Sequence, residues 1–258
     1  MDGLCFYPLA GIGEVREGDS IPRLIIEAIE RKGISPQGTD LLVIAHKILS
    51  KAQGRQVLLS DVAVSERALE LAKITGKPPG VVQLALDESQ EIVVARRGAL
   101  ICRSRLGWVS ANAGVDLSNT ASEEHAVLLP LDPDEDARGI SCELEKHFGC
   151  KIAVIISDTH GRPLREGIVG VAIGCWGINP MRSYIGNPDR SGSLMQSSVE
   201  AVADELASAA SLVTGQGAEG IPAVLIRGCK FPWEECGSGA LMRKKERELF
   251  WPKNGENE

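Results

Sequence analysis

The amino-acid sequence predicts a mixed α/β (α+β) fold without a P-loop or Rossmann domain. Short apolar runs typical of buried strands alternate along the chain with segments whose apolar residues recur at helical spacing. No segment repeats at the periods of solenoid proteins, and no nucleotide fingerprint occurs in its required context. With 43% hydrophobic and 24% charged residues, the 258-residue chain has the composition of a globular protein.

The first half of the chain is expected to form three helices and three strands. Asp19 or Ser20 can cap a helix that has Pro22 in its first turn and ends at Gly33. Apolar runs predict the strands, and Gly98 predicts a hairpin between the last two. In order, we expect a helix over residues 20–33, a strand over 40–45, helices over 65–76 and 78–89, and strands over 91–98 and 99–111. The apolar stripe of the second helix would comprise Leu69, Leu71, Ala72 and Ile74.

The second half is expected to add two helices and three strands. Prolines mark a turn before a polar helix that ends near Gly149, and a longer helix stops at Gly215. In order, we expect a helix within residues 129–150, strands over 151–157 and 167–175, a helix over 195–214 and a strand over 223–228. We expect a single unit over residues 1–250, with a small subdomain or insertion near 80–105 and a frayed tail over 251–258.

Charge and cysteine content narrow the classes of partner. The net charge of −7 gives no broad electrostatic hold on nucleic acid, so a phosphate must be bound locally. The chain contains neither a long apolar run nor a signal-peptide pattern, which predicts no membrane partner. The seven cysteines are scattered and include no C-x-x-C pair, as is typical of a reducing cytoplasm.

Two polar clusters follow apolar strands, where catalytic groups of α/β folds usually lie. In SANAGVDLSN (residues 110–119), Asn112, Asp116 and Asn119 bracket a glycine turn, and a simple Asx-rich turn explains them equally well. SDTHGRPLREG (residues 157–167) combines an acid, a hydroxyl, an imidazole and two arginines, a combination that is hard to explain by turn chemistry, although a structural turn is the alternative. Carboxylate and hydroxyl oxygens suit Mg²⁺ or Mn²⁺, and guanidinium groups suit a carboxylate or phosphate.

Two further segments have both a binding and a structural interpretation. On a helix, Lys47 and Lys51 would share one face at i, i+4, where an anion would offset their repulsion; a solvated basic face is the alternative. GQGAEG (residues 215–220) ends a helix and precedes a strand, the reverse of the dinucleotide fingerprint. It is either a loop whose backbone N–H groups approach phosphate or a plain helix cap.

Taken together and in order, these segments resemble the coenzyme F420-0:γ-glutamyl ligase family. The most specific matches are ANAGVDLSN, SDTHGRPLR and AVADELA with the following glycine loop, joined by LLVIAHKILSKAQGR, SERALELA, DESQEIV and LPLDPDEDA. The resemblance covers roughly residues 8–230. It implies the ligase-like fold with mixed sheets and a homodimer. Some relatives carry a second, flavin-reductase-like domain, and we expect this chain to be the stand-alone ligase.

The resemblance also implies an activity and its ligands. The family joins L-glutamate to F420-0 with GTP as cosubstrate, through an acyl phosphate, and releases GDP and phosphate. Two divalent ions, Mg²⁺ or Mn²⁺, would serve each site; a role for K⁺ and the addition of further γ-linked glutamates stay open. Carried onto this chain, the resemblance assigns Asp116 and Asp158 to one metal ion, and Thr159 and Gln216 to the second.

The nucleotide would contact other residues of the chain. The resemblance implies GTP contacts from Ile12, Gly13, Glu14, Val15, His46, Lys47, Lys51 and Asn119. Many relatives have small hydroxyl residues at the 46–47 pair, where this chain has a histidine and a lysine. By their chemistry, Arg162 and Arg165 are candidates to bind a substrate carboxylate or phosphate.

Two rival functions remain. Asp158, His160 and Gly161 match the start of the D-x-H-G motif of dinuclear metallophosphoesterases, although the companion G-N-H motif is absent. A non-enzymatic GTP-binding regulator would use the same loops but would not release GDP in response to glutamate.

Overall fold

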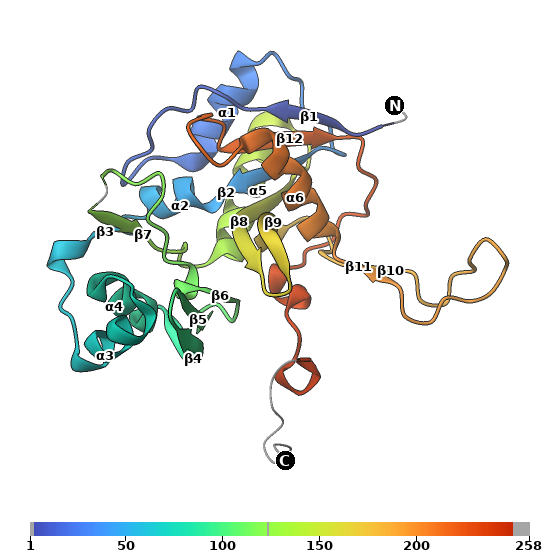
Figure 1. Ribbon diagram of the computed structural model, residues 1–258. Helices are drawn as coiled ribbons and strands as arrows, with labels where there is room; N and C mark the ends of the chain where they lie inside the picture. Colours follow the sequence, from blue (N-terminus) through green and yellow to red (C-terminus); the bar gives the residue numbers. More distant parts are fainter. Residues whose placement is uncertain (1–2, 123, 250–258) are drawn as a thin grey trace.

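A computed structural model describes residues 3–122 and 124–249. A five-stranded sheet forms its centre, with the strand order β1-β12-β2-β8-β9 (Figure 1). The pair β2 and β8 is parallel, and the other neighbours are antiparallel. The strands are β1 (Cys5–Pro8), β2 (Leu41–Ala45), β8 (Ala153–Arg162), β9 (Arg165–Trp176) and β12 (Ala223–Arg227).

Helices cover both faces of this sheet. On one face, alternate strand residues such as Leu42 and Ile44 pack against α1 (Ile21–Arg31) and α5 (Pro133–Phe148). On the other face, Leu41 and Val43 pack against α6 (Val202–Thr214). Because successive side chains of a strand point to opposite faces, two buried faces require an unbroken apolar run such as that of β2.

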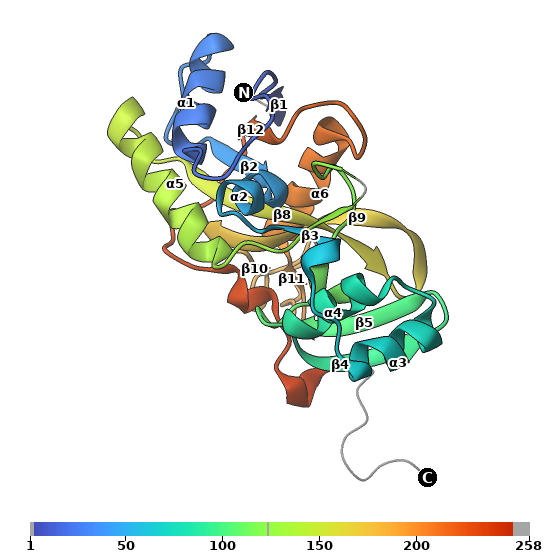
Figure 2. The same cartoon turned by 90° about the vertical axis from the view of Figure 1, so that its left-hand side faces the viewer.

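A second sheet and two helices enclose a separate core. This sheet has the order β4-β5-β6 and lies against α3 and α4 in the lower part of Figure 2. The elements are α3 (Glu66–Thr75), α4 (Pro79–Asp87), β4 (Ser89–Arg96), β5 (Ala99–Ser104) and β6 (Val109–Ala111). Ser65 caps α3, because its hydroxyl oxygen accepts a 3.2 Å hydrogen bond from the Ala68 N–H.

The remaining elements are short. A ribbon of β3 (Gln56–Leu58) and β7 (His125–Val127) links the two cores, and α2 (His46–Ala52) directly follows β2. A long arm (residues 182–200) leaves the body through the pair β10 (Arg182–Ser183) and β11 (Val199–Glu200). Single 3₁₀ turns are η1 (Leu59–Asp61), η2 (Asn112–Gly114), η3 (Ser238–Leu241) and η4 (Lys245–Arg247).

The mixed α/β prediction is confirmed, but several bounds were wrong. The strand expected over residues 151–157 extends to Arg162, because it pairs with β9 as a long hairpin. The helix expected from residue 195 begins at Val202, because the preceding residues belong to the arm. The segment 99–111 divides into β5 and β6.

The predicted stripe of α3 is also partly wrong. Leu69 and Ile74 are 45% and 51% exposed, while Ala68 and Thr75 take the buried positions. The predicted tail over residues 251–258 lies outside the described residues. In the described part of the chain, no helix has the length and apolarity needed to cross a membrane.

Candidate functional site

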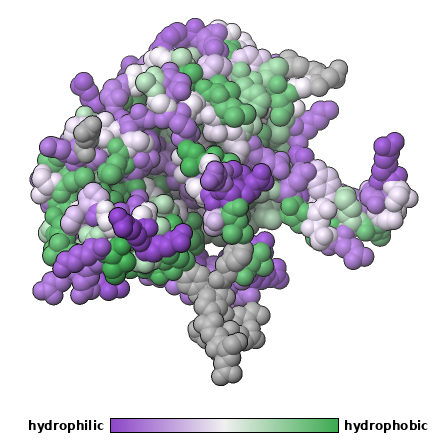
Figure 3. Space-filling model, in the orientation of Figure 1, coloured by the Kyte–Doolittle hydropathy of each residue, from purple (hydrophilic) through white to green (hydrophobic). Residues whose placement is uncertain are grey.

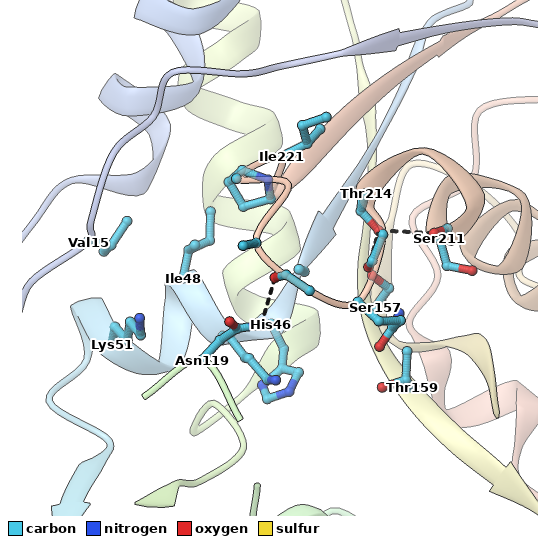
Figure 4. Close-up of a pocket in the computed structure, with 18 of the residues that line it drawn as sticks. Val15, His46, Ile48, Lys51, Asn119, Ser157, Thr159, Ser211, Thr214 and Ile221 are labelled. Atoms are coloured by element: carbon cyan, nitrogen blue, oxygen red, sulfur yellow. Dashed lines mark hydrogen bonds between the residues drawn. The ribbon is translucent and has the colours of Figure 1, made fainter. Parts of the chain in front are cut away.

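A cavity of about 390 Å³ opens where β2 ends, beside the middle of β8 (Figure 4). Segments far apart in the sequence contribute its walls, and their side chains converge in the figure. The lining comprises Gly13, Glu14, Val15, Ala45, His46, Lys47, Ile48, Lys51, Asn119, Thr120, Ser157, Asp158, Thr159, Gly170, Ser211, Thr214, Gly215, Gln216, Gly217, Ala218, Gly220, Ile221 and Pro222.

Two lysines of α2 present cations to this cavity. Lys47 and Lys51 lie one turn apart, as the sequence predicted. The Lys47 ammonium lies 2.8 Å from Asp116 Oδ2 and donates to Ser118 Oγ at 2.7 Å. The Lys51 ammonium pairs with the Glu14 carboxylate. Each cation therefore already has a carboxylate partner.

Asp116 is placed by an unusual turn. Asn112 and Ala113 both have left-handed backbone conformations, with φ of 52° and 56°, and Gly114 follows at 81°. Such conformations cost energy in residues other than glycine and often occur at functional sites. Backbone hydrogen bonds in both directions with Val127 then fix Asp116. Burial acts to raise the pKa of Asp116, but Lys47 and Ser118 outweigh it and lower that pKa.

Asp158 is held between two imidazoles. Its side chain is 10% exposed; His46 Nε2 lies 3.3 Å from Oδ1, and His160 Nε2 lies 3.2 Å from Oδ2. The His46 nitrogen is buried but not aligned for a hydrogen bond, whereas the Thr159 N–H donates to Oδ1 at 2.7 Å. Burial acts to raise the pKa of Asp158, but the two histidines hold it well below its ordinary value.

The glycine-containing loop before α1 forms another wall. Arg31 donates to the carbonyl oxygens of Gly11 at 2.8 Å and Ala10 at 3.3 Å, which ties this loop to the end of α1. Across the cavity, the Asn119 amide donates to the Gly217 carbonyl at 3.4 Å. This contact joins two of the predicted segments (Figure 4).

Most predicted site residues line the cavity, but four do not. Ile12 is 9% exposed and belongs to the core beside the loop. Asp116 contacts the lining residue Lys47 without being part of the lining itself. Arg162 and Arg165 lie where β8 turns into β9, and the Arg162 guanidinium donates to backbone carbonyls of its own hairpin.

Part of the lining was not predicted from the sequence. Ser211 and Thr214 lie in the last turn of α6, and Gly170 belongs to β9. The two hydroxyl residues are spaced i, i+3 immediately before the glycine loop, a signal that was available in the sequence. No comparable signal marks Gly170 as a lining residue, because its position at the cavity depends on the close packing of α6 on β9.

The oxygen donors at the cavity fit a divalent ion. Asp158 offers a carboxylate, Thr159 a hydroxyl and Gln216 an amide oxygen. Within residues 3–122 and 124–249, no three His, Cys, Asp or Glu side chains gather as a metal site. Mg²⁺ usually takes one or two carboxylates, with substrate phosphates and water completing its shell. This donor set fits that pattern.

Comparison with known proteins identifies the family. A family model described as F420-0:Gamma-glutamyl ligase matches residues 11–228. The chain is 42% identical over 252 residues to the coenzyme F420:L-glutamate ligase of Methanothermobacter thermautotrophicus, covering 96% of this chain and 99% of the relative. It is 43% identical over 211 residues to the ligase of the same name from Methanocaldococcus jannaschii, covering 82% and 84%. The protein therefore belongs to the F420-0:γ-glutamyl ligase family.

Proposed function

We propose that this protein joins L-glutamate to F420-0 in a GTP-dependent reaction that releases GDP and phosphate. The observation that carries the proposal is that two lysines, an asparagine and a set of hard oxygen donors line one and the same cavity. The names of the relatives support glutamate and F420 as substrates. The lysines and the glycine-rich walls support a nucleotide phosphate.

The proposed chemistry has two steps. The F420-0 carboxylate attacks the γ-phosphorus of GTP, which forms an acyl phosphate and breaks the bond to GDP. The amine of glutamate, after losing a proton, then attacks the acyl carbon; an amide forms and phosphate leaves. Phosphoryl transfer depends mainly on positioning and on neutralising the charge of the phosphate oxygens.

The residues of the chain divide this work. Lys47 and Lys51 act as point charges on the phosphates, and Asn119 with the loop Gly13–Val15 holds the nucleotide. Asp158, Thr159 and Gln216, with Asp116 behind Lys47, would hold Mg²⁺ or Mn²⁺, which when bound neutralises phosphate charge. Arg162 and Arg165, on the neighbouring hairpin, are proposed to meet a substrate anion.

Product analysis tests the proposal. Purified protein is incubated with F420-0, GTP, glutamate and Mg²⁺ or Mn²⁺, with and without K⁺, and the products are weighed by mass spectrometry. We expect F420 carrying one glutamate, together with equimolar GDP; heavier products would reveal further additions. GTP binding without glutamate-dependent GDP release would favour a regulator, and phosphate-ester hydrolysis without glutamate would favour a phosphoesterase.

We also propose that the protein forms a homodimer through the arm. The arm extends away from the body (Figures 1 and 3). It carries Ile185, Leu194 and Val199, which are 55%, 64% and 40% exposed. Exposed apolar groups on a projecting segment are stabilised when a partner covers them. A second copy of the chain, which the family resemblance implies, is the partner that we propose for this surface.

A further inference from the structure

The two lysines of the cavity differ in the carboxylate that each one holds. Lys51 pairs with Glu14, whose side chain is 71% exposed and has no proposed role as a metal ligand. Lys47 pairs with Asp116, whose side chain is 30% exposed and is a proposed metal ligand. The ammonium of Lys47 therefore contacts Asp116 Oδ2, an atom that a bound divalent ion would need as a ligand.

Both carboxylate oxygens of Asp116 already have a hydrogen-bond partner, which limits where an incoming cation can bind. Asp116 Oδ1 accepts the Ser118 N–H at 2.7 Å, and Oδ2 accepts Lys47 at 2.8 Å. Backbone hydrogen bonds with Val127 hold the residue itself in place. An ammonium and a divalent cation repel each other, so an ion that binds Asp116 Oδ2 has to displace the Lys47 ammonium from that oxygen.

The displaced Lys47 side chain can turn toward the cavity. Lys47 lies at the wall of the cavity, one helical turn from Lys51. Like charges at this spacing repel by a few tenths of a kcal/mol in an isolated helix, so a free Lys47 favours an anion between the two ammonium groups. The phosphates of a nucleotide provide this anion.

We propose that Lys47 is an internal cation that occupies Asp116 until a divalent ion displaces it, and that the released ammonium then binds nucleotide phosphate. The inference rests on the proposed function, because it assigns Asp116 to the metal. Metal binding and phosphate binding are thereby coupled, and such coupling acts equally in both directions.

Mn²⁺ binding to the nucleotide-free protein tests the exchange directly. Free Mn²⁺ is measured by electron paramagnetic resonance for the wild type, Lys47→Met and Lys51→Met. Lys51→Met is the matched control, because it removes the same charge from the same helix but frees a different carboxylate. We expect Lys47→Met to bind Mn²⁺ about threefold to fivefold more tightly than Lys51→Met, in keeping with the strength of partly exposed ion pairs.

A second measurement follows the lysine. In buffer with a chelator and no metal, Asp116→Asn should bind GTP more tightly than the wild type, because Lys47 is already free. The gain should vanish when Asp116→Asn is combined with Lys47→Met. If the gain persists in the double variant, it reflects a general loss of negative charge, and the exchange is wrong.

The outcomes separate this inference from the proposed function. Unchanged or weaker Mn²⁺ binding by Lys47→Met, relative to Lys51→Met, would mean that Lys47 only supports Asp116 and would overturn the exchange, whether or not the wild type ligates glutamate. Unaltered Mn²⁺ binding by Asp116→Asn would overturn the exchange by removing its metal ligand. Unfolding curves check each variant, and Lys47→Gln replaces Lys47→Met if that protein does not fold.

Discussion

His46 Nε2 lies 3.3 Å from Asp158 Oδ1, with the two side chains 2% and 10% exposed. His46 is the first residue of α2, and its other ring nitrogen lies 3.2 Å from Ser50 Oγ. Lys47, the next residue, contacts Asp116. Two consecutive residues thus connect the start of one helix to both aspartates of the candidate metal site.

Replacing His46 should destabilise the protein in a metal-sensitive way. His46→Ala leaves a nearly buried carboxylate with one fewer compensating partner, and we expect the free energy of unfolding to fall by about 1–3 kcal/mol. Mn²⁺ should reduce this loss, because a bound cation compensates Asp158. Urea unfolding with and without Mn²⁺ measures both effects. His147→Ala, which removes a partner of Glu30 at the surface, is the control; equal losses in the two variants would contradict the prediction.

Asp116 and Asp158 should act as one unit in ligation. Each of Asp116→Ala and Asp158→Ala should lower kcat about a thousand-fold if the two residues share an ion, and the double variant should lose little more. Steady-state kinetics on the three variants, with folding checked by circular dichroism, provides the measurement. Multiplicative losses would show that the two aspartates act on separate ions.

Arg31 should affect nucleotide binding from outside the cavity. Its hydrogen bonds to Ala10 and Gly11 hold the loop that continues into the wall at Gly13. Arg31→Met should raise the KM for GTP about threefold to tenfold, with kcat changing little, as expected for loss of ~0.5–1.5 kcal/mol. Arg23→Met removes an arginine of the same helix that pairs with its exposed neighbour Glu27, and should leave KM unchanged. A change in kcat alone would rule out this positioning role.

Two glycines offer a paired test of the fold. A Cβ at Gly170 would lie 2.5 Å from the Ala207 carbonyl oxygen, so α6 would have to move away from β9. We expect Gly170→Ala to lower the free energy of unfolding by about 1–3 kcal/mol. Gly139 lies within α5 and has open space around it. Gly139→Ala should instead raise stability by about 0.5–1 kcal/mol, because alanine favours the helix. Chemical denaturation of both variants checks the opposite signs.

The arm provides a prediction about assembly. Aspartate at both Ile185 and Leu194 should convert the proposed dimer to a monomer, because charged groups cannot be buried unpaired in an apolar contact. Analytical ultracentrifugation measures the mass. Leu69→Asp changes an exposed leucine on α3, far along the chain from the arm, and should leave the assembly intact. A wild-type protein that is monomeric at all concentrations would refute the dimer.

Local patterns predicted the elements of the fold better than their limits. The strand β2 was predictable from its own apolar run, and α3 was predictable from the serine at its start and the glycine at its end. In both cases the signal lies within the segment itself. The short strands β1, β3 and β7 were missed because each depends on a partner distant in sequence. Likewise, β8 continues past its apolar part only because β9 pairs with it, so Asp158 lies within a strand rather than in a turn.

In the candidate site, too, individual residues were predictable from the sequence, whereas contacts between distant segments were not. Residue chemistry and the family resemblance predicted Lys51, Asn119, Asp158 and Thr159, which meet at the cavity. Pairings between them were not predictable, because the contact of Lys47 with Asp116 requires the turn at Asn112 to bring two distant segments together. The roles assigned to the metal ligands and to the hairpin arginines stay predictions.

The position of β12 between β1 and β2 also constrains how the protein is made. During synthesis the N-terminal strands leave the ribosome long before β12, yet β12 supplies the only connection between them in the central sheet of the described chain. Until then, apolar edges of β1 and β2 stay unpaired, and such edges promote aggregation of folding intermediates. The loop that lines the cavity from residue 215 to 222 leads directly into β12. Because the segment over residues 215–222 both lines the cavity and leads into β12, a nascent chain that ends before this point lacks the strand that joins β1 to β2 and also lacks this wall of the cavity.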